Sequence, residues 1–149
     1  MTRHLLRPPA AIARRTSTGS ALVEFALVIP VLLMLLLGTV ELGWGIYVYH
    51  FVASAASQAA RYASVRGAEC SSWPSACPAS ASDIQTYVRD LAPGAIDTSA
   101  LTVSTTWTPN NSPGSVVNVT VQYNFLLNVP FTAPITLSLQ TSSDLVINQ

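Results

Sequence analysis

A basic stretch opens the chain, and an apolar segment without any charge then covers residues 25–40. Its centre, residues 32–37, is an unbroken run of leucine and methionine. With the mostly apolar flanks at 21–23 and 42–49, the segment supplies the ~20 residues that a helix needs to cross a hydrocarbon core of about 30 Å. The pattern predicts a transmembrane helix over residues 20–47.

The residues on either side of this segment give it a direction. Four arginines and no acidic residue precede residue 20, and Trp44 stands with two tyrosines at the far end of the segment. Positive charge favours the cytoplasmic side of a membrane, and aromatic rings favour the membrane–water interface. We therefore expect residues 1–19 in the cytoplasm and the chain after about Tyr49 on the opposite, extracytoplasmic side.

Beyond the membrane the same helix is expected to continue over residues 48–67. Apolar residues recur there at three- and four-residue spacing, which is the pattern of one buried helix face. This face consists of Val48, Phe51, Val52, Ala55, Ala59, Tyr62 and Ala63. Gly67 is the expected C-cap, and one helix over residues 20–66 would be about 70 Å long at about 1.5 Å per residue.

The remaining part, residues 68–149, forms the predicted extracytoplasmic domain. Apolar and polar residues alternate there in three stretches, which predicts strands at about 101–108, 115–126 and 135–146. Ahead of them, Ser82 is the expected N-cap of a short helix over residues 83–91. The predicted fold is α+β and pilin-like, with a long N-terminal helix packed on a small antiparallel three-stranded sheet.

Composition narrows the function. Half of the residues are hydrophobic and 9% are charged, against about 25% charged in a typical soluble domain. After residue 19 the chain has seven acidic residues and three arginines, a balance that argues against nucleic acid as a partner. No nucleophile beside a base, carboxylate pair or phosphate-binding glycine loop stands out, so we predict neither an enzyme nor a cofactor.

Cys70 and Cys77 are the only cysteines, and a loop rich in serine and proline separates them. A pair this close in an oxidising compartment indicates a disulfide. A metal site would need more ligands, because His4 and His50 are distant in sequence and His4 lies on the other side of the membrane. A redox motif would have the tighter C-x-x-C spacing. We therefore predict a structural disulfide and no metal site.

Glu24 stands at the cytoplasmic edge of the apolar segment, five residues after Gly19. A charged side chain at the centre of a bilayer costs roughly 2.5–3.5 kcal/mol on insertion scales, so such residues usually have a partner. An acid that snorkels to the interface is the alternative for Glu24. Further along, Pro30 either kinks the helix or is simply tolerated by it.

These residues resemble a known family. The segment Gly19-Ser-Ala-Leu-Val-Glu24-Phe25 is similar to the processing motif of type IVb prepilins of the Flp class, in which the glutamate precedes an aromatic residue. The leucine-rich run after Pro30, the later Glu41-Leu-Gly and the alanine-rich helix that follows resemble TadE-like proteins. These proteins are minor pseudopilins of tight-adherence (Tad) pilus systems, and the resemblance covers roughly residues 16–67.

The resemblance implies that a membrane prepilin peptidase cuts between Gly19 and Ser20, and that Glu24 and Phe25 act in assembly. Glu24 would lie one helical turn from the new amine of Ser20 and would pair with it or with the amine of a neighbouring subunit. The implied partners are the peptidase, the inner-membrane assembly platform and other pilin or pseudopilin subunits. The implied location is the cytoplasmic membrane, which the chain crosses once. Incorporation into a pilus would follow as a later stage.

Two other organisations remain open at this point. An uncleaved, signal-anchored binding module outside the cytoplasm would keep residues 1–19 and would not need Glu24. A secreted soluble domain, released near Ala55, would be free of the membrane.

Overall fold

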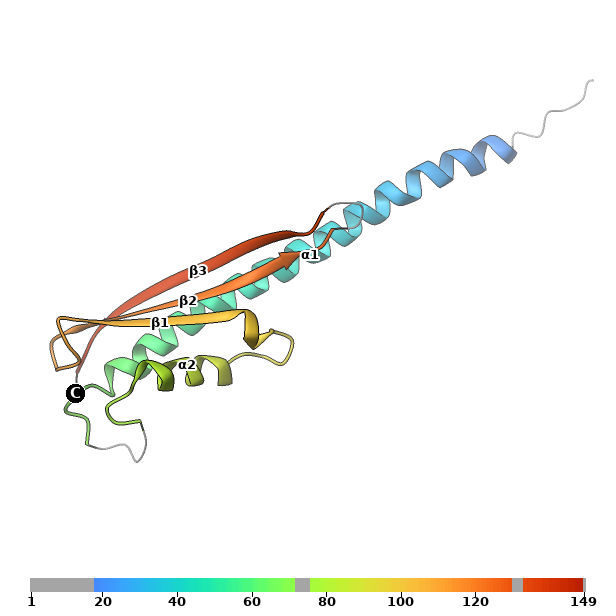
Figure 1. Ribbon diagram of the computed structural model, residues 1–149. Coiled ribbons are helices and arrows are strands. Elements are labelled where there is room, and N and C mark those ends of the chain that lie inside the picture. The colour runs from blue at the N-terminus through green and yellow to red at the C-terminus, as the bar shows by residue number, and fades with distance from the viewer. Residues whose placement is uncertain (1–17, 72–75, 130–132, 149) are drawn as a thin grey trace, which may run out of the picture.

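The computed structural model describes residues 18–71, 76–129 and 133–148. Most of the predicted cleaved leader, residues 1–17, lies outside the described residues. The rest consists of one long helix, one short helix and a three-stranded sheet, with a single 3-10 turn (η1, Thr98–Ala100) before the first strand. Figure 1 shows the sheet lying along only one half of the long helix.

The long helix, α1 (Thr18–Ser64), has 47 residues and contains Pro30 without interruption. It ends three residues before the predicted C-cap, so the assignment of that cap to Gly67 was wrong. The carbonyl of Ser64 accepts a hydrogen bond from the backbone N–H of Asn148, at 2.9 Å. The last carbonyls of a helix have no partner within the helix. Here the C-terminal segment supplies that partner for Ser64, in place of the local hydrogen bond of a glycine cap.

The sheet consists of β1 (Leu101–Thr108), β2 (Val116–Leu127) and β3 (Ile135–Val146), in the order β1-β2-β3. Both pairings are antiparallel, with Leu101 opposite Tyr123 and Leu127 opposite Ile135. The predicted α+β architecture, a long helix on a three-stranded antiparallel sheet, is confirmed. Each strand begins and ends within one residue of its predicted range.

The core lies between the sheet and the second half of α1. Alternate residues of β2 point toward the helix and are buried, from Val117 to Phe125, as the period of two requires. On the helix, the predicted face is buried or half-buried, but Ala56 and Ala60 are buried as well. The buried stripe of α1 is thus wider than predicted, because α1 contacts β2, β3 and a second helix at once. Its alanines allow these elements to approach the helix axis closely.

The second helix, α2 (Ala81–Asp90), packs against β1 and α1, with Ile84 and Val88 fully buried. Its N-cap is Ser80 and not Ser82, and the helix begins two residues earlier than predicted. The backbone N–H of Ser80 donates to the Asp83 carboxylate at 2.9 Å, and the Ser80 hydroxyl accepts from the N–H of Asp83. This reciprocal capping box satisfies two end groups together, which a cap at Ser82 does not do here.

The capping box ties the stability of α2 to pH. Hydrogen bonds from the Ser80 hydroxyl and then from its backbone N–H hold the pKa of the Asp83 carboxyl below its ordinary value of 3.8. Because the folded-state pKa is the lower one, the stabilisation is present above the ordinary pKa of aspartate. It is lost as the pH falls through the lowered, folded-state pKa.

Ser80→Ala is expected to reduce the free energy of unfolding by about 1 kcal/mol, the usual cost of losing an N-cap side chain. Ser82→Ala is the matched control and should change stability little, because Ser82 does not cap the helix. Denaturant unfolding of the full chain in detergent, followed by circular dichroism, measures both. A larger loss for Ser82→Ala than for Ser80→Ala would contradict the assignment of the cap.

Candidate functional site

The first half of α1 carries the residues that the sequence singled out for processing and assembly. Gly19, Ser20, Glu24 and Phe25 all lie within the helix and are exposed. A Cβ atom built on Gly19 would meet nothing within 4 Å. Ser20 and Glu24 are four residues apart, so their side chains lie on the same face of the helix. The structure therefore gathers these four residues on one uncovered helix end, which projects away from the sheet in Figure 1.

This half of α1 is strongly apolar, and most of it is not covered by the rest of the described chain. Its most apolar window has a mean hydropathy of 2.6 and no buried residue, and α1 is the one described helix that is long and apolar enough to cross a membrane. Large side chains such as Leu22, Leu27 and Leu35 are about 70% exposed. Exposed apolar surface of this extent requires either lipid or other apolar helices around it.

The cysteines lie far from this end. Cys70 and Cys77 form a disulfide with Cα atoms 5.8 Å apart, in the loop between α1 and α2. The same loop is held to the end of α1 by the N–H of Ala79, which donates to the carbonyl of Arg66. The bridge therefore closes the connection at the tip of the domain and takes no part in the exposed helix end.

Aromatic side chains join the two helices near this connection. The rings of Tyr62 and Tyr87 stack at a centroid distance of 4.3 Å, and the guanidinium of Arg66 lies 3.8 Å from the centroid of the Tyr62 ring. Stacked rings and a cation over an aromatic face each contribute modestly to stability. Tyr62, predicted only as part of an apolar helix face, thus also positions α2 against α1.

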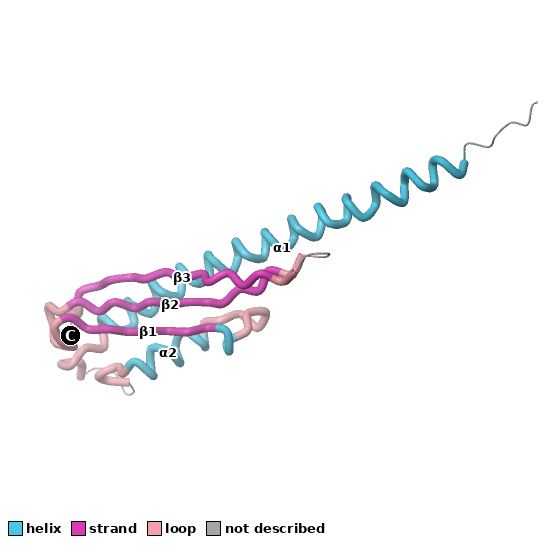
Figure 2. Tube along the Cα trace, turned by 45° about the horizontal axis from the view of Figure 1, so that its top comes forward, coloured by secondary structure: helices cyan, strands magenta, loops and turns pink. Residues whose placement is uncertain are grey.

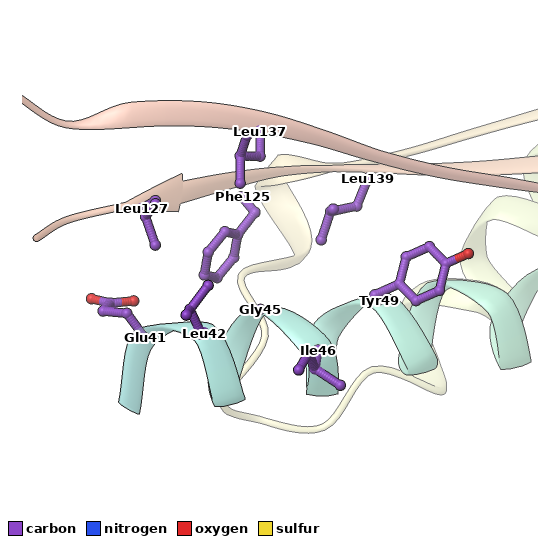
Figure 3. A pocket seen from close by; sticks show the side chains of 9 residues that line it. All are labelled: Glu41, Leu42, Gly45, Ile46, Tyr49, Phe125, Leu127, Leu137 and Leu139. Carbon is purple, nitrogen blue, oxygen red and sulfur yellow. The ribbon is translucent and has the colours of Figure 1, made fainter. Parts of the chain in front are cut away.

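One surface feature was not found from the sequence. A hollow of about 240 Å³ lies between α1 and the β2–β3 hairpin, and its lining is almost entirely apolar. Figure 3 shows Phe125, Leu127, Leu137 and Leu139 pointing from the strands toward the helix, with Glu41 at one end and Tyr49 near the other. The alternating leucines of β3 were the available signal for this hollow, but in the sequence they predicted only the inner face of a strand.

In the parts of the chain that the structure describes, no group of three or more histidine, cysteine, aspartate or glutamate side chains is placed to hold a metal ion.

The long helix α1 is bare along its first half and carries a small antiparallel sheet along its second half, which gives the described chain an α+β architecture. Residues 19–61 match the family model of the TadE-like protein, so the resemblance stated from the sequence is confirmed for this segment. The match begins at Gly19 and lies entirely within α1. No curated protein and no solved structure matches the chain.

Proposed function

We propose that the chain is a minor pseudopilin of a Tad-type pilus system, acting in pilus biogenesis and adherence. It is inserted with its N-terminus in the cytoplasm, processed by a prepilin peptidase after Gly19, and held in the membrane by α1. The observation that carries this proposal is the TadE-like match from Gly19 onward on a helix whose first half is apolar and bare. On this account the chain is a substrate of the peptidase and a structural subunit, and not a catalyst.

The surroundings of Gly19 support cleavage at this position. The helix end around it is uncovered, and Gly19 has no side chain that would clash within a membrane-embedded protease. Cleavage between Gly19 and Ser20 removes the arginine-rich leader and leaves a free amine on Ser20. That amine begins the helix one turn away from the Glu24 carboxylate.

Assembly through α1 follows from the same geometry. The bare apolar surface of the helix suits packing against the corresponding helices of other pilin subunits and the assembly platform in the membrane. An ionised Glu24 in this low-dielectric setting needs a partner. The amine of Ser20, from the same subunit or from a neighbour, supplies the opposite charge and sets the register between subunits. Phe25 is 66% exposed beside it and would contribute apolar contact.

Glu24→Ala tests this role. We expect the variant to be cleaved after Gly19 like the wild type, but to support far fewer surface pili in a strain that lacks the wild-type gene. Pili are counted by electron microscopy, and the processed protein is followed by immunoblot. Glu69→Ala, an exposed acid outside α1, is the matched control and should leave pilus number unchanged. Wild-type pilus number with Glu24→Ala would contradict the assembly role.

A further inference from the structure

The end of the β2–β3 hairpin lies beside the part of α1 that was expected to be inside the membrane. Leu127 and Val129 share a hollow of about 400 Å³ with Met34, Gly38 and Leu42 of α1. Figure 2 shows β2 and β3 running together along α1 toward its N-terminal half. The sheet domain therefore does not stop at the outer end of the predicted span, and it reaches back along the helix.

Because α1 is one uninterrupted helix, position along it measures depth in the membrane. A hydrocarbon core of about 30 Å takes about 20 helical residues. Counted from Ser20 the span ends near residue 40, and counted from the residue after Glu24 it ends near residue 44. Gly38 lies inside the outer half of the core in both cases, and Met34 lies in the outer half in the first case and at the middle of the core in the second. The hairpin end that shares a hollow with them must then lie below the outer surface of the membrane.

The chemistry of the hairpin end suits this depth. Leu126, Ile135 and Leu137 are 58%, 52% and 43% exposed. No charged residue occurs between residues 98 and 143, which includes the whole of β2 and most of β3. The opposite end of the same two strands is polar, with the Asn118 side chain donating to the Asp144 carboxylate. The sheet is thus apolar toward the membrane and carries its charge away from it.

The two hollows along α1 form one trough. Leu42 and Leu127 line both the hollow beside Met34 and the hollow shown in Figure 3. The trough therefore continues the bare apolar surface of α1 toward the C-terminal half of the helix, between the helix and the strands. The lining of the trough is almost entirely apolar, with Thr39 and Glu41 as its polar members on α1. A flexible acyl chain that covers the helix surface can follow the trough along its apolar leucine-lined wall.

We propose that the β2–β3 hairpin end is a second membrane-contacting element, which enters the outer leaflet beside α1 and takes phospholipid acyl chains into this trough. Strand pairing up to Leu127 and Ile135 satisfies the backbone groups between the two strands. The outer edge of β3 has no partner strand in the described sheet, and unpaired backbone groups are costly in hydrocarbon. This inference rests on the membrane insertion of α1, and not on cleavage or pilus assembly.

Nitroxide accessibility in the full chain, reconstituted into vesicles of phosphatidylcholine and phosphatidylglycerol, tests the proposal. Both native cysteines are bonded to each other, so a single introduced cysteine can be labelled without reductant. Leu126→Cys and Ile135→Cys place labels at the hairpin end. Val116→Cys is the matched control for Leu126→Cys, because Val116 is an exposed residue of β2 on the same face at the far end of that strand. Leu33→Cys reports on α1 itself.

The measured quantity is the ratio of collisions with oxygen, which concentrates in lipid, to collisions with a water-soluble nickel chelate. We expect a ratio at Leu126 and Ile135 that is several-fold higher than at Val116 and approaches that at Leu33. A water-like ratio at both hairpin positions, with a lipid-like ratio at Leu33, would overturn the inference and leave the membrane insertion of α1 intact. A water-like ratio at Leu33 would overturn both. A third outcome is that the hairpin labels are protected from both oxygen and the nickel chelate, and that this protection disappears when the protein is diluted in lipid. That result would place a second copy of the chain in the trough and would also overturn the proposal.

Discussion

Gly19→Val is expected to leave the chain in the membrane as a precursor that is 19 residues longer than the processed wild type. The reason lies in the protease and not in the fold of the substrate. A side chain at this position meets nothing within 4 Å in the described structure, so the helix can accept the valine. The active site of a membrane-embedded peptidase, which must enclose the backbone on both sides of the cut, cannot. The two forms are separated by immunoblot and by intact mass.

The matched control for this prediction is Gly43→Val. Gly43 is another α1 glycine at which an added Cβ meets nothing within 4 Å. Gly43→Val therefore changes apolarity and helix propensity in the same way as Gly19→Val, but it lies far from the proposed cut. We expect Gly43→Val to be processed normally. Normal processing of Gly19→Val as well would remove the proposed cleavage site.

Loss of the Cys70–Cys77 disulfide is expected to lower the free energy of unfolding by roughly 2.5 kcal/mol, which is the chain-entropy estimate for so short a loop. The bridge closes the connection between α1 and α2, where the Ala79 N–H is bonded to Arg66 and Ala79 is buried. Without it, this connection is freer in the unfolded chain, and the docking of α2 on β1 and α1 must order a longer segment. The domain has a small core, so this loss is a large fraction of its stability.

Denaturant unfolding of the full chain in detergent, with and without reductant, measures this effect. The Cys70→Ser, Cys77→Ser double variant should unfold at lower denaturant than the oxidised wild type and should be indifferent to reductant. Reduced wild type should fall to the level of the variant. Equal stability of all these samples would contradict a stabilising role for the bridge.

Much of the fold follows from the sequence because its periodicities are strong. The apolar run before Glu41 fits only a long helix, and the alternation from Val117 to Phe125 fits only a strand with one buried face. The cap of α2 was harder, because Ser80 and Ser82 each precede a residue three positions on that can complete a capping box. Only the folded geometry shows that Asp83 turns back to Ser80.

The trough and the depth of the hairpin could not be predicted, because both depend on how far the sheet slides along α1. Strand patterns fix the register between strands, with Leu127 opposite Ile135, but carry no information on the register between sheet and helix. That offset is set by the packing of the α1 alanines and of Phe125, whose ring lies 3.5 Å from the Cβ position of Gly45. Ala56 and Ala60 were missed for a related reason, since alanine occurs on both buried and exposed helix faces and its position alone does not show which face is covered.

The processing residues stand out in sequence because their role depends on local order along the chain. The Gly19-to-Glu24 spacing is the same in any conformation, and the helix only adds that both lie on an uncovered end. No tertiary contact is needed to bring them together. For this reason a cleavage site can be proposed from the sequence alone, whereas the surfaces proposed to meet lipid or other subunits emerge only from the structure.

The N-terminus of the membrane-extracted protein, determined by mass spectrometry in cells with and without the prepilin peptidase, tests the central claim most directly. We predict a start at Ser20 when the peptidase is present and an intact leader when it is absent. An intact leader in both strains would contradict the pseudopilin account and leave a signal-anchored protein outside the cytoplasm.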